Sequence, residues 1–523
     1  MTGATARSWD VIVVGGGSTG AVLAARLAED PARQVLLLEA GPDVRAGDTP
    51  PEMHGGDQWA ISDPAQFPEY HWSDLPARTT SAQPPVHYRR GRGVGGTSLI
   101  NWRIAFRPPL DDFDVWEAAG GTAWAPGSVL GSFVRSEDDL LFGDEPYHGR
   151  GGPVPISRLR EDGWSTIDAA MRDAAVGAGV PWSPDLNAPG SAGASMLPYS
   201  GVDGARMSMN EAYLEPARGR PNLLVVADAL VDRVLLDGAR AVGVRAVIDG
   251  TPTDVRGDEV VISCGAIHSP AVLQRSGVGP AALLRSLGIG VVADVPVGDG
   301  LQDHIAVAIA RQLGDGYVGP ANGRPFSTCV RFSTGVAGSK AHDVMVQVLS
   351  PPSLEPFPFG IWGATLEQPL STGTVRITAP DRSRNPAIDL RFLTETIDRG
   401  RMRLAAARVL ELLHEPALTK VCRGEAVPYR VSMDGMPDVS GSFDDLSGDA
   451  AVDRWIAETA ATSLHASSTC AMGAVVDGSC RVFGIDGLRV ADLSIAPVVP
   501  RANPNLTAIM IGEHLASMIQ AGG

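Results

Sequence analysis

Residues 10–39 read DVIVVGGGSTGAVLAARLAEDPARQVLLLE, and this stretch decides the fold. The apolar run DVIVV at 10–14 ends in glycines, and the apolar positions of 21–27 then recur with the spacing of a helix. A second apolar run, VLLLE, fills 35–39. The pattern predicts a strand, a tight turn, a helix and a second strand, which together form the first unit of a Rossmann-type α/β layer.

The turn in this unit carries Gly15, Gly17 and Gly20 in the order G-x-G-x-x-G, and Glu39 follows Gly20 by 19 residues. Such glycines let a pyrophosphate approach the helix N-terminus, where free N–H groups favour an anion. An acidic residue at this interval hydrogen-bonds ribose hydroxyls in dinucleotide sites. We therefore predict a dinucleotide site, with a glycine turn that binds nothing as the alternative. These residues alone do not separate FAD from NAD.

Composition and charge narrow the class of protein. The 523 residues are 44% hydrophobic and 20% charged, which is globular composition with length enough for two intimately joined domains. There are 43 basic and 60 acidic residues, for a formal charge of −17, and the basic residues form no cluster. A nucleic-acid partner and an anionic membrane surface are therefore not expected.

The five cysteines are scattered and show no CxxC pairing, so we predict buried thiols in a reducing compartment, without a disulfide framework or a metal site. The first residues lack a long apolar core behind basic residues, and no apolar run reaches the length of about 18 residues that a membrane span needs. A cytoplasmic protein without a transmembrane segment is expected.

Pattern changes along the chain predict two interleaved domains. Residues 41–101 show no hydrophobic periodicity, and this segment is longer than an ordinary connecting loop within a compact domain. Residues 222–263 read as a run of strands, and residues 311–450 carry no phosphate-binding signature. We predict a discontinuous cofactor-binding domain over 7–155, 206–310 and 458–523. A substrate-binding domain then covers 156–205 and 311–457.

Two further motifs follow the glycine turn along the chain. GRGVGGTSLIN at 91–101 places consecutive glycines before hydroxyl and amide side chains, which suits contacts with a phosphate or a ring edge; a flexible surface loop is the alternative. CGAIHSPAVLQRSGVGP at 264–280 reads as a helix start after a strand. Ser269 is expected to cap that helix and Pro270 to occupy its first position.

A histidine and an asparagine near the C-terminus can perform acid-base chemistry. His465 lies in SLHASSTCAMG, and Asn503 lies in PRANPNL, 38 residues later. An imidazole with a pKa of about 6.5 can take an alcohol proton at neutral pH, while an amide can hold the same oxygen. The alternatives are a core histidine and an asparagine that caps a helix beginning at Pro504.

These four motifs, in this order, resemble the glucose-methanol-choline (GMC) flavoprotein oxidoreductases over essentially the whole chain. GGTSLIN is similar to the first family signature and GAIHSPAVLQRSGVGP to the second, and GDGLQDH, ending at His304, follows. The resemblance implies an α/β, two-domain fold: a Rossmann-like FAD-binding domain interleaved with an antiparallel-sheet substrate domain. HGRGGPVPISR and the C-terminal segments resemble compact bacterial alcohol oxidases of the family.

The resemblance also implies roles for residues. His465 is the expected catalytic base and Asn503 its partner. The expected FAD contacts are Gly15, Gly17, Ser18, Thr19, Gly20, Glu39, Ala40, Trp72, Gly95, Gly96, Thr97, Asn101, Val231, Asp492, Asn503, Asn505 and Thr507.

Several positions depart from the family pattern. Tyr88 stands where some members attach FAD through a histidine, with His87 one residue away, so non-covalent FAD is expected. Ser468 replaces the usual glycine three residues after the catalytic histidine, and Ser463 is polar where some oxidases carry an apolar residue. His304 is expected to be structural.

The implied reaction is oxidation of a primary alcohol, aromatic or furanic ones included, to the aldehyde. His465 accepts the hydroxyl proton while a hydride passes to flavin N5, and the electrons go on to oxygen or another redox carrier. Two alternatives stay open: a lyase resembling the FAD-containing hydroxynitrile lyases, and a protein that keeps FAD for structure or electron relay.

Overall fold

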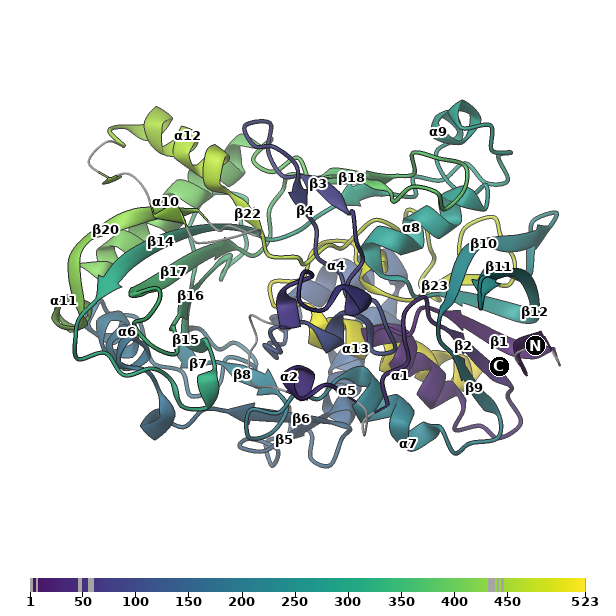
Figure 1. The fold of residues 1–523 in the computed structure, drawn as a ribbon, viewed down its shortest axis with the longest axis horizontal. Helices are drawn as coiled ribbons and strands as arrows, with labels where there is room; N and C mark the ends of the chain where they lie inside the picture. Colours follow the sequence, from purple (N-terminus) through teal and green to yellow (C-terminus); the bar gives the residue numbers. More distant parts are fainter. Residues whose placement is uncertain are drawn as a thin grey trace.

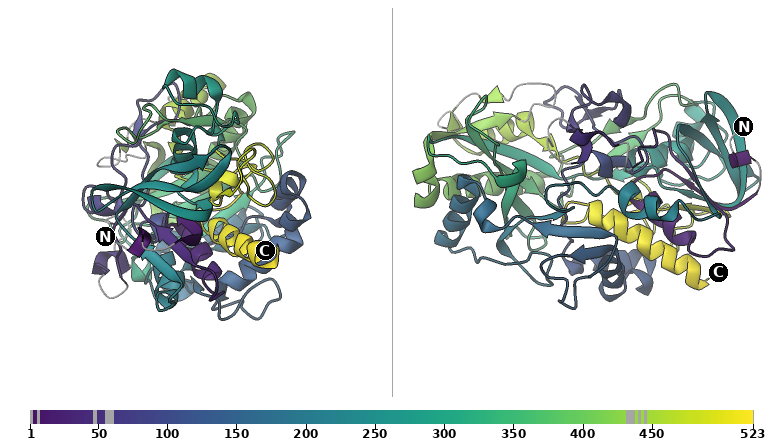
Figure 2. Two further views of the ribbon diagram at one scale, coloured as in Figure 1. Left: turned by 90° about the vertical axis from the view of Figure 1, so that its right-hand side faces the viewer. Right: turned by 60° about the horizontal axis from the view of Figure 1, so that its bottom comes forward.

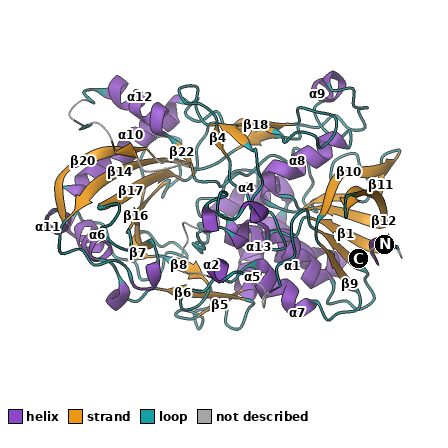
Figure 3. Ribbon diagram, in the orientation of Figure 1, coloured by secondary structure: helices purple, strands orange, loops and turns teal. Residues whose placement is uncertain are grey.

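The computed structural model describes residues 3–5, 8–45, 49–54, 61–430, 438–439, 442–443 and 446–522. Two large sheets organise the chain, at the right and the left of Figure 1, and helices pack against both (Figure 3). The shorter helices are α2 (Pro51–His54), α4 (Phe113–Gly120), α5 (Pro126–Ser136), α7 (Glu215–Ala217), α9 (Ala281–Ser286), α11 (Pro416–Val421) and α12 (Asp449–Thr459).

The first sheet contains the predicted opening unit. Five of its strands run parallel, in the order β9 (Leu223–Val226), β2 (Val35–Leu38), β1 (Trp9–Val14), β12 (Thr251–Ile262) and β23 (Leu488–Val490). The long β12 pairs with β1 through its second half. Its first half joins an antiparallel ribbon made by β10 (Ala229–Asp237) and β11 (Arg240–Ile248). The strands predicted at 222–263 are confirmed.

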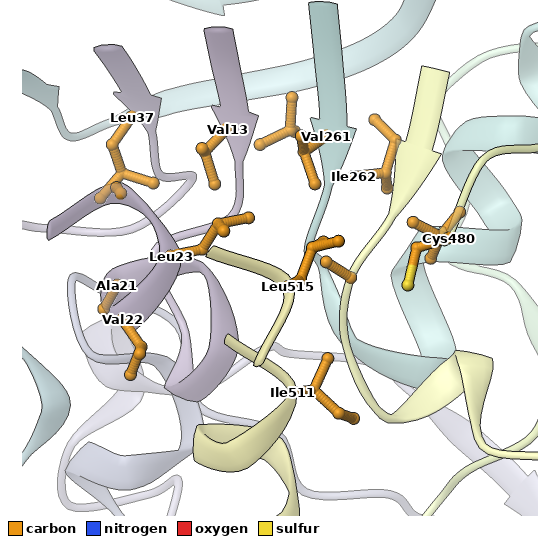
Figure 4. Close-up of a cluster of buried hydrophobic side chains, with 14 of the residues drawn as sticks. Val13, Ala21, Val22, Leu23, Leu37, Val261, Ile262, Cys480, Ile511 and Leu515 are labelled. Carbon is orange, nitrogen blue, oxygen red and sulfur yellow. The ribbon is translucent and has the colours of Figure 1, made fainter. Parts of the chain in front are cut away.

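Two helices from opposite ends of the chain cover one face of this sheet. Figure 4 shows Leu23 of α1 (Ser18–Leu27) and Leu515 of α13 (Asn505–Gly522) beside Val13 and Val261 of the sheet, and all four belong to one buried core. The right-hand view of Figure 2 shows α13 as the long yellow helix. The C-terminal helix therefore returns to the glycine turn, because its apolar face is buried there.

The helix of the third motif begins earlier than predicted. Helix α8 spans Gly265–Arg275, with Cys264 as its N-cap, so Ser269 and Pro270 lie inside it; the expected cap and first position were wrong. Proline lacks the N–H that would bond to the carbonyl four residues earlier. That carbonyl belongs to Ala266, and the Thr469 hydroxyl donates to it at 2.7 Å. A side chain from the C-terminal segment thus satisfies the group that Pro270 leaves free.

The second sheet is antiparallel, as expected for the substrate domain. Its order is β21 (Asp438–Val439), β20 (Cys422–Arg430), β14 (Ile305–Leu313), β17 (Phe359–Leu366), β16 (Val344–Leu349), β15 (Phe326–Phe332) and β7 (Gly193–Met196), with β22 (Ala461–Thr462) paired to β14. Helices α10 (Thr396–Leu413) and α6 (Thr166–Gly177) pack on one face. Alternation along β17 sends Trp362, Ala364 and Leu366 toward that helical core, so Thr365 points to the opposite face.

The aperiodic excursion after residue 41 reaches both halves of the fold. It contributes β3 (Pro76–Arg78) and β4 (Val86–His87) to a five-stranded sheet with β13 (Asp299–Leu301), β18 (Gly373–Arg376) and β19 (Ala387–Asp389). Parts of the excursion, 46–48 and 55–60, lie outside the described residues. The proposed domain boundaries remain a prediction.

A buried ionic cluster lies beside a small three-stranded sheet of β5 (Glu137–Asp139), β6 (Val154–Arg158) and β8 (Pro198–Ser200). The two ring nitrogens of His148 lie 2.8 Å from carboxylate oxygens of Glu137 and Asp185. Arg158 pairs with Asp139, also at 2.8 Å. We call these residues, with His148 at their centre, the His148 cluster. Hydrogen bonds to the two carboxylates raise the pKa of His148 to about 9, against the opposing effect of burial.

Two expectations from composition can be compared with the fold. All five cysteines lie within the described part of the chain, and each is free. No helix in the described ranges is long and apolar enough to cross a membrane.

Candidate active site

One cavity of about 390 Å³ connects the glycine turn of the first sheet to the open face of the second. It is lined by fifteen of the eighteen residues that the sequence predicted for the site: Gly15, Gly17, Ser18, Thr19, Glu39, Ala40, Trp72, Gly96, Thr97, Asn101, Val231, His465, Asp492, Asn503 and Asn505. Motifs that are far apart in the chain therefore share a single pocket of ligand-binding size.

Three predicted residues stand behind the walls of this cavity. An added Cβ at Gly20 would lie 1.9 Å from the carbonyl oxygen of Gly15, and the Gly95 N–H donates to the carbonyl of Gly16 at 2.7 Å. Thr507 is buried within α13. The FAD contacts predicted for these three residues remain predictions.

Glu39 is built into the nucleotide end of the cavity. Its carboxylate accepts the N–H groups of Gly16, Gly41 and Gly93 at 2.7, 2.9 and 3.1 Å. Burial raises the pKa of Glu39, and these three hydrogen bonds oppose that rise. A carboxylate has about four acceptor positions, so about one remains for a ribose hydroxyl. The residues present therefore fit the nucleotide of FAD.

Two glycine loops cross at the same end. A Cβ added to Gly96, whose φ is +55°, would lie 2.6 Å from the Cα of Gly17. Only glycine lets the second motif close on the first without a clash between backbones. The alternative of a flexible surface loop at 91–101 is therefore wrong, because this segment packs against the dinucleotide turn.

His268 is a cavity residue that the sequence reasoning did not single out. Its ring lies 4.2 Å from the ring of Trp72, and burial lowers its pKa to about 3. The Nε2 atom is buried and has no hydrogen-bond partner among the described residues. A neutral imidazole with an open nitrogen in the wall can bind a polar group of a cofactor, and its position inside the third motif was the signal that could have revealed it.

His465 and Asn503 meet at the other end of the cavity. The Asn503 amide nitrogen lies 3.5 Å from Nε2 of His465. Burial, then the nearby His304 and Arg90, lower the pKa of His465 well below its ordinary value. The ring is therefore neutral at pH 7 and can accept a proton.

Hydrogen bonds fix which nitrogen of His465 is free. His304 Nε2 lies 2.9 Å from the carbonyl oxygen of Pro500, which can only accept, so this nitrogen carries the proton. Burial lowers the pKa of His304, whose Nδ1 is then an acceptor. That Nδ1 lies 2.8 Å from Nδ1 of His465, which must donate. The lone pair of His465 is consequently on Nε2, the atom that faces Asn503. This contact gives His304 more than the structural role expected from sequence.

Asp303 and Tyr88 hold the segment that carries His465. The Asp303 carboxylate accepts the N–H of His465 at 2.9 Å and the Tyr88 hydroxyl at 2.6 Å, and the Thr462 hydroxyl also donates to it. Tyr88 Oη in turn accepts the N–H of Ala466 at 3.1 Å. The residue at the position where some relatives attach FAD is thus committed to anchoring the catalytic loop.

An acidic side chain completes this end of the cavity. Glu367 follows β17 and lies near His304, the residue before β14, with its Oε1 4.0 Å from Nδ1 of His304. Burial raises the pKa of Glu367 to about 7. Its Oε2 is buried without a partner in the described parts of the chain. No motif marked this residue, because it belongs to the substrate domain.

A nucleotide site and a proton-accepting histidine that open into one cavity are what a flavin-dependent alcohol oxidoreductase requires, and this chain is an enzyme of that class. Two models described as GMC oxidoreductase match residues 9–306 and 369–512, so the chain belongs to the GMC oxidoreductase family. The sequence-based identification is confirmed, and with it the α/β fold and the dependence on FAD.

Several relatives share almost the full length of the chain. The 5-(hydroxymethyl)furfural oxidase of Methylovorus sp. (strain MP688) is 33% identical over 98% of both chains, and the oxygen-dependent choline dehydrogenase of Burkholderia thailandensis is 34% identical over 99% of this chain and 94% of its own. The crystal structure of pyridoxine 4-oxidase from Mesorbium loti superposes with a TM-score of 0.87, at 28% identity over 99% and 100% of the two chains.

Proposed function

We propose that this chain oxidises a primary alcohol to its aldehyde, with His465 as the base, Asn503 as the residue that holds the hydroxyl oxygen, and oxygen or another small carrier as the final electron acceptor. One observation carries the assignment: the chain of hydrogen bonds from Pro500 through His304 leaves the lone pair of His465 on the atom that faces Asn503. The other ring nitrogen, Nδ1, already donates its hydrogen bond to His304.

The spacing between the two side chains suits an alcohol. A separation of 3.5 Å between the amide nitrogen and Nε2 is longer than a normal hydrogen bond, so the two groups are poorly satisfied by each other. A hydroxyl group between them accepts a hydrogen bond from the Asn503 amide and donates one to His465 Nε2. The alcohol is therefore oriented by the same contact that positions its proton.

Proton removal follows from the tautomer of His465. Nε2 takes the hydroxyl proton, and Nδ1–H keeps its bond to His304 while the ring becomes positively charged. Bound FAD supplies the hydride acceptor for this oxidation. Because burial keeps the pKa of His465 low, the free enzyme enters the reaction with an unprotonated base throughout the neutral range.

The cofactor site is assigned to the nucleotide end of the cavity. Glu39 has room for a ribose hydroxyl, the α1 N-terminus presents backbone N–H groups to a pyrophosphate, and Trp72 and His268 offer ring surfaces. Tyr88 is engaged with Asp303, which supports non-covalent binding of FAD.

Two aromatic side chains in the wall of the cavity suit a planar substrate. Trp102 and Phe326 line the cavity and meet edge to face, with ring centroids 5.2 Å apart and planes inclined at 62°. Aromatic walls of this kind pack well against an aromatic or furanic ring. We therefore propose that the alcohol carries its hydroxymethyl group on such a ring.

The test is anaerobic reduction of the bound flavin by a panel of aromatic primary alcohols. His465→Ala should slow the bleaching by about 100- to 10,000-fold, the contribution of a positioned base, while FAD remains bound. Flavin that stays oxidised with every alcohol, together with cleavage of an aromatic cyanohydrin, would overturn the proposal in favour of the lyase. Admitting air to the bleached enzyme then shows whether oxygen is the acceptor.

A further inference from the structure

Two arginines are buried in the wall of the alcohol cavity beside its aromatic pair. Arg103 follows Trp102 and is 2% exposed, and Arg324 precedes Phe326 by two residues and is 3% exposed. Their guanidinium carbons lie 6.0 and 4.8 Å from the centre of the Tyr199 ring. The two cations therefore gather around one side chain of β8.

Neither guanidinium group has its hydrogen-bonding capacity filled. Arg103 Nη1 donates to the carbonyl of Gly204, but its Nε is buried without a partner. Arg324 Nη2 donates to the Ser157 hydroxyl at 3.1 Å, while its Nε and Nη1 are both buried and unpartnered. Three donors on two cations are thus unpaired within the part of the chain that the structure describes.

Three other buried arginines of this protein are paired with carboxylates. Arg107, Arg158 and Arg401 each contact a carboxylate oxygen at 2.8 Å. Across the described residues, neither Arg103 nor Arg324 has a carboxylate oxygen within 4.0 Å of its nitrogens. A buried cation without a counter-ion is costly, so proteins pair almost all of them.

Electrostatics agree with this account. Burial, and then the repulsion of Arg324, lower the pKa of Arg103 to about 10. Burial also lowers the pKa of Arg324, against the opposing attraction of Asp203. Both groups nevertheless remain charged at neutral pH. Two like charges held together without a carboxylate in contact create a positive potential that an anion relieves.

Arg103 gives this potential access to the cavity. It lines the same cavity as His465 and Asn503, whereas Arg324 does not line it. Its backbone has φ +62°, a conformation that is strained for a residue with a side chain. The Asn101 side chain accepts the Arg103 N–H at 3.1 Å and so helps to hold this geometry.

We infer that Arg103 and Arg324 form a carboxylate-binding subsite, and that the substrate is an aromatic or furanic alcohol carrying a carboxylate on its ring. The inference rests on the proposed function and names its substrate class. Trp102 and Phe326 receive the ring, Arg103 binds the carboxylate while Arg324 adds its positive charge from behind the cavity wall, and the hydroxymethyl group reaches His465. The subsite is not explained by the pyrophosphate of FAD, because the site proposed for the pyrophosphate is the N-terminus of α1, the helix that packs on the first sheet.

The direct test compares acids with their neutral isosteres on the FAD-loaded enzyme. We expect kcat/KM for 3- or 4-(hydroxymethyl)benzoate to exceed that of the matching benzamide by about 10- to 150-fold, the range of a buried hydrogen bond to a charged group. Arg103→Met should remove this preference, Arg324→Gln should weaken it, and Arg103→Lys, which keeps the charge, should retain part of it. Equal use of acid and amide by the wild type would overturn the inference while leaving alcohol oxidation intact.

A binding measurement separates this inference from the proposed function. Benzoate, which has no hydroxymethyl group, should perturb the flavin absorption spectrum on titration, and its dissociation constant should rise at least tenfold in Arg103→Met. Benzamide should bind weakly to both proteins. These outcomes stand even if no alcohol reduces the flavin. Inorganic phosphate that binds as tightly as benzoate and is displaced by no ring compound would assign the arginines to a free oxyanion and overturn the carboxylated substrate.

Discussion

Replacing His304 isolates the step that makes His465 a base. The Leu side chain has a similar volume but no acceptor, so in His304→Leu the Nδ1–H of His465 loses its 2.8 Å partner. The ring must then bury an unsatisfied donor or adopt the tautomer in which Nε2 carries the proton and cannot accept another. A buried donor left unpaired costs about 1–3 kcal/mol, and each 1.36 kcal/mol is a factor of ten in rate, so flavin reduction should slow by about 5- to 150-fold.

The matched control is His304→Asn, whose side-chain oxygen can occupy the position of Nδ1 and accept the same hydrogen bond. We expect this variant to reduce flavin within about fivefold of the wild type, which is a smaller loss than an unpaired donor causes. The assay is stopped-flow bleaching at saturating alcohol without oxygen, with FAD content and thermal midpoint measured alongside. The reasoning is refuted if His304→Leu reduces flavin at the wild-type rate, or if Asn and Leu are equally slow in proteins of equal stability.

Three more outcomes follow from groups already described. Ionised Glu367 favours positive charge on the pair of His304 and His465. Flavin reduction should therefore become faster as the pH rises through about 7, the pKa of the Glu367 carboxyl. Rates recorded across that pH range should not show this increase in Glu367→Gln. The pKa of His148 is raised to about 9, above its unfolded value of about 6.5, so its stabilising contribution is complete below about pH 6.5 and is lost as the pH rises through 9. Unfolding midpoints should fall over that window, and His148→Gln should fall less steeply from a lower start. Thr469→Val leaves the Ala266 carbonyl buried and unpaired and should lower the free energy of unfolding by about 1–3 kcal/mol, which an unchanged denaturant midpoint would contradict.

Local rules predicted the elements that their own residues determine. The strand, turn and helix that begin at Trp9 were predictable because the apolar period and the glycines are contained in one short stretch. The start of α8 was not, although Ser269 and Pro270 follow the ordinary rule for a helix start. The rule fails here because Thr469, about 200 residues away, donates the hydrogen bond to the Ala266 carbonyl that Pro270 cannot provide. Tertiary contacts of this kind leave no trace in the local pattern.

The candidate site divides in the same way. His465 and Asn503 could be placed by motif, and the fold brings their side chains together. His304 was assigned a structural role, because its bond to His465 joins residues 161 positions apart and depends on the pairing of β22 with β14. Arg103 and Glu367 could not be predicted at all. Their importance comes from burial without a partner, a property that only the packed structure defines.

Charge, rather than a missing hydrogen bond alone, is what assigns those two residues to a ligand. The indole nitrogens of Trp362 and Trp455 also lack partners in the described ranges, and both side chains lie in the core under the second sheet. A neutral donor left unpaired costs about 1–3 kcal/mol, which surrounding apolar packing can offset. An unpaired buried ion costs several kcal/mol more. The anion proposed for the subsite compensates Arg103, and Glu367 avoids the cost by holding its proton up to about pH 7. The carboxylate of the proposed substrate therefore pairs with Arg103, and the uncharged hydroxymethyl group is the part that reaches His465.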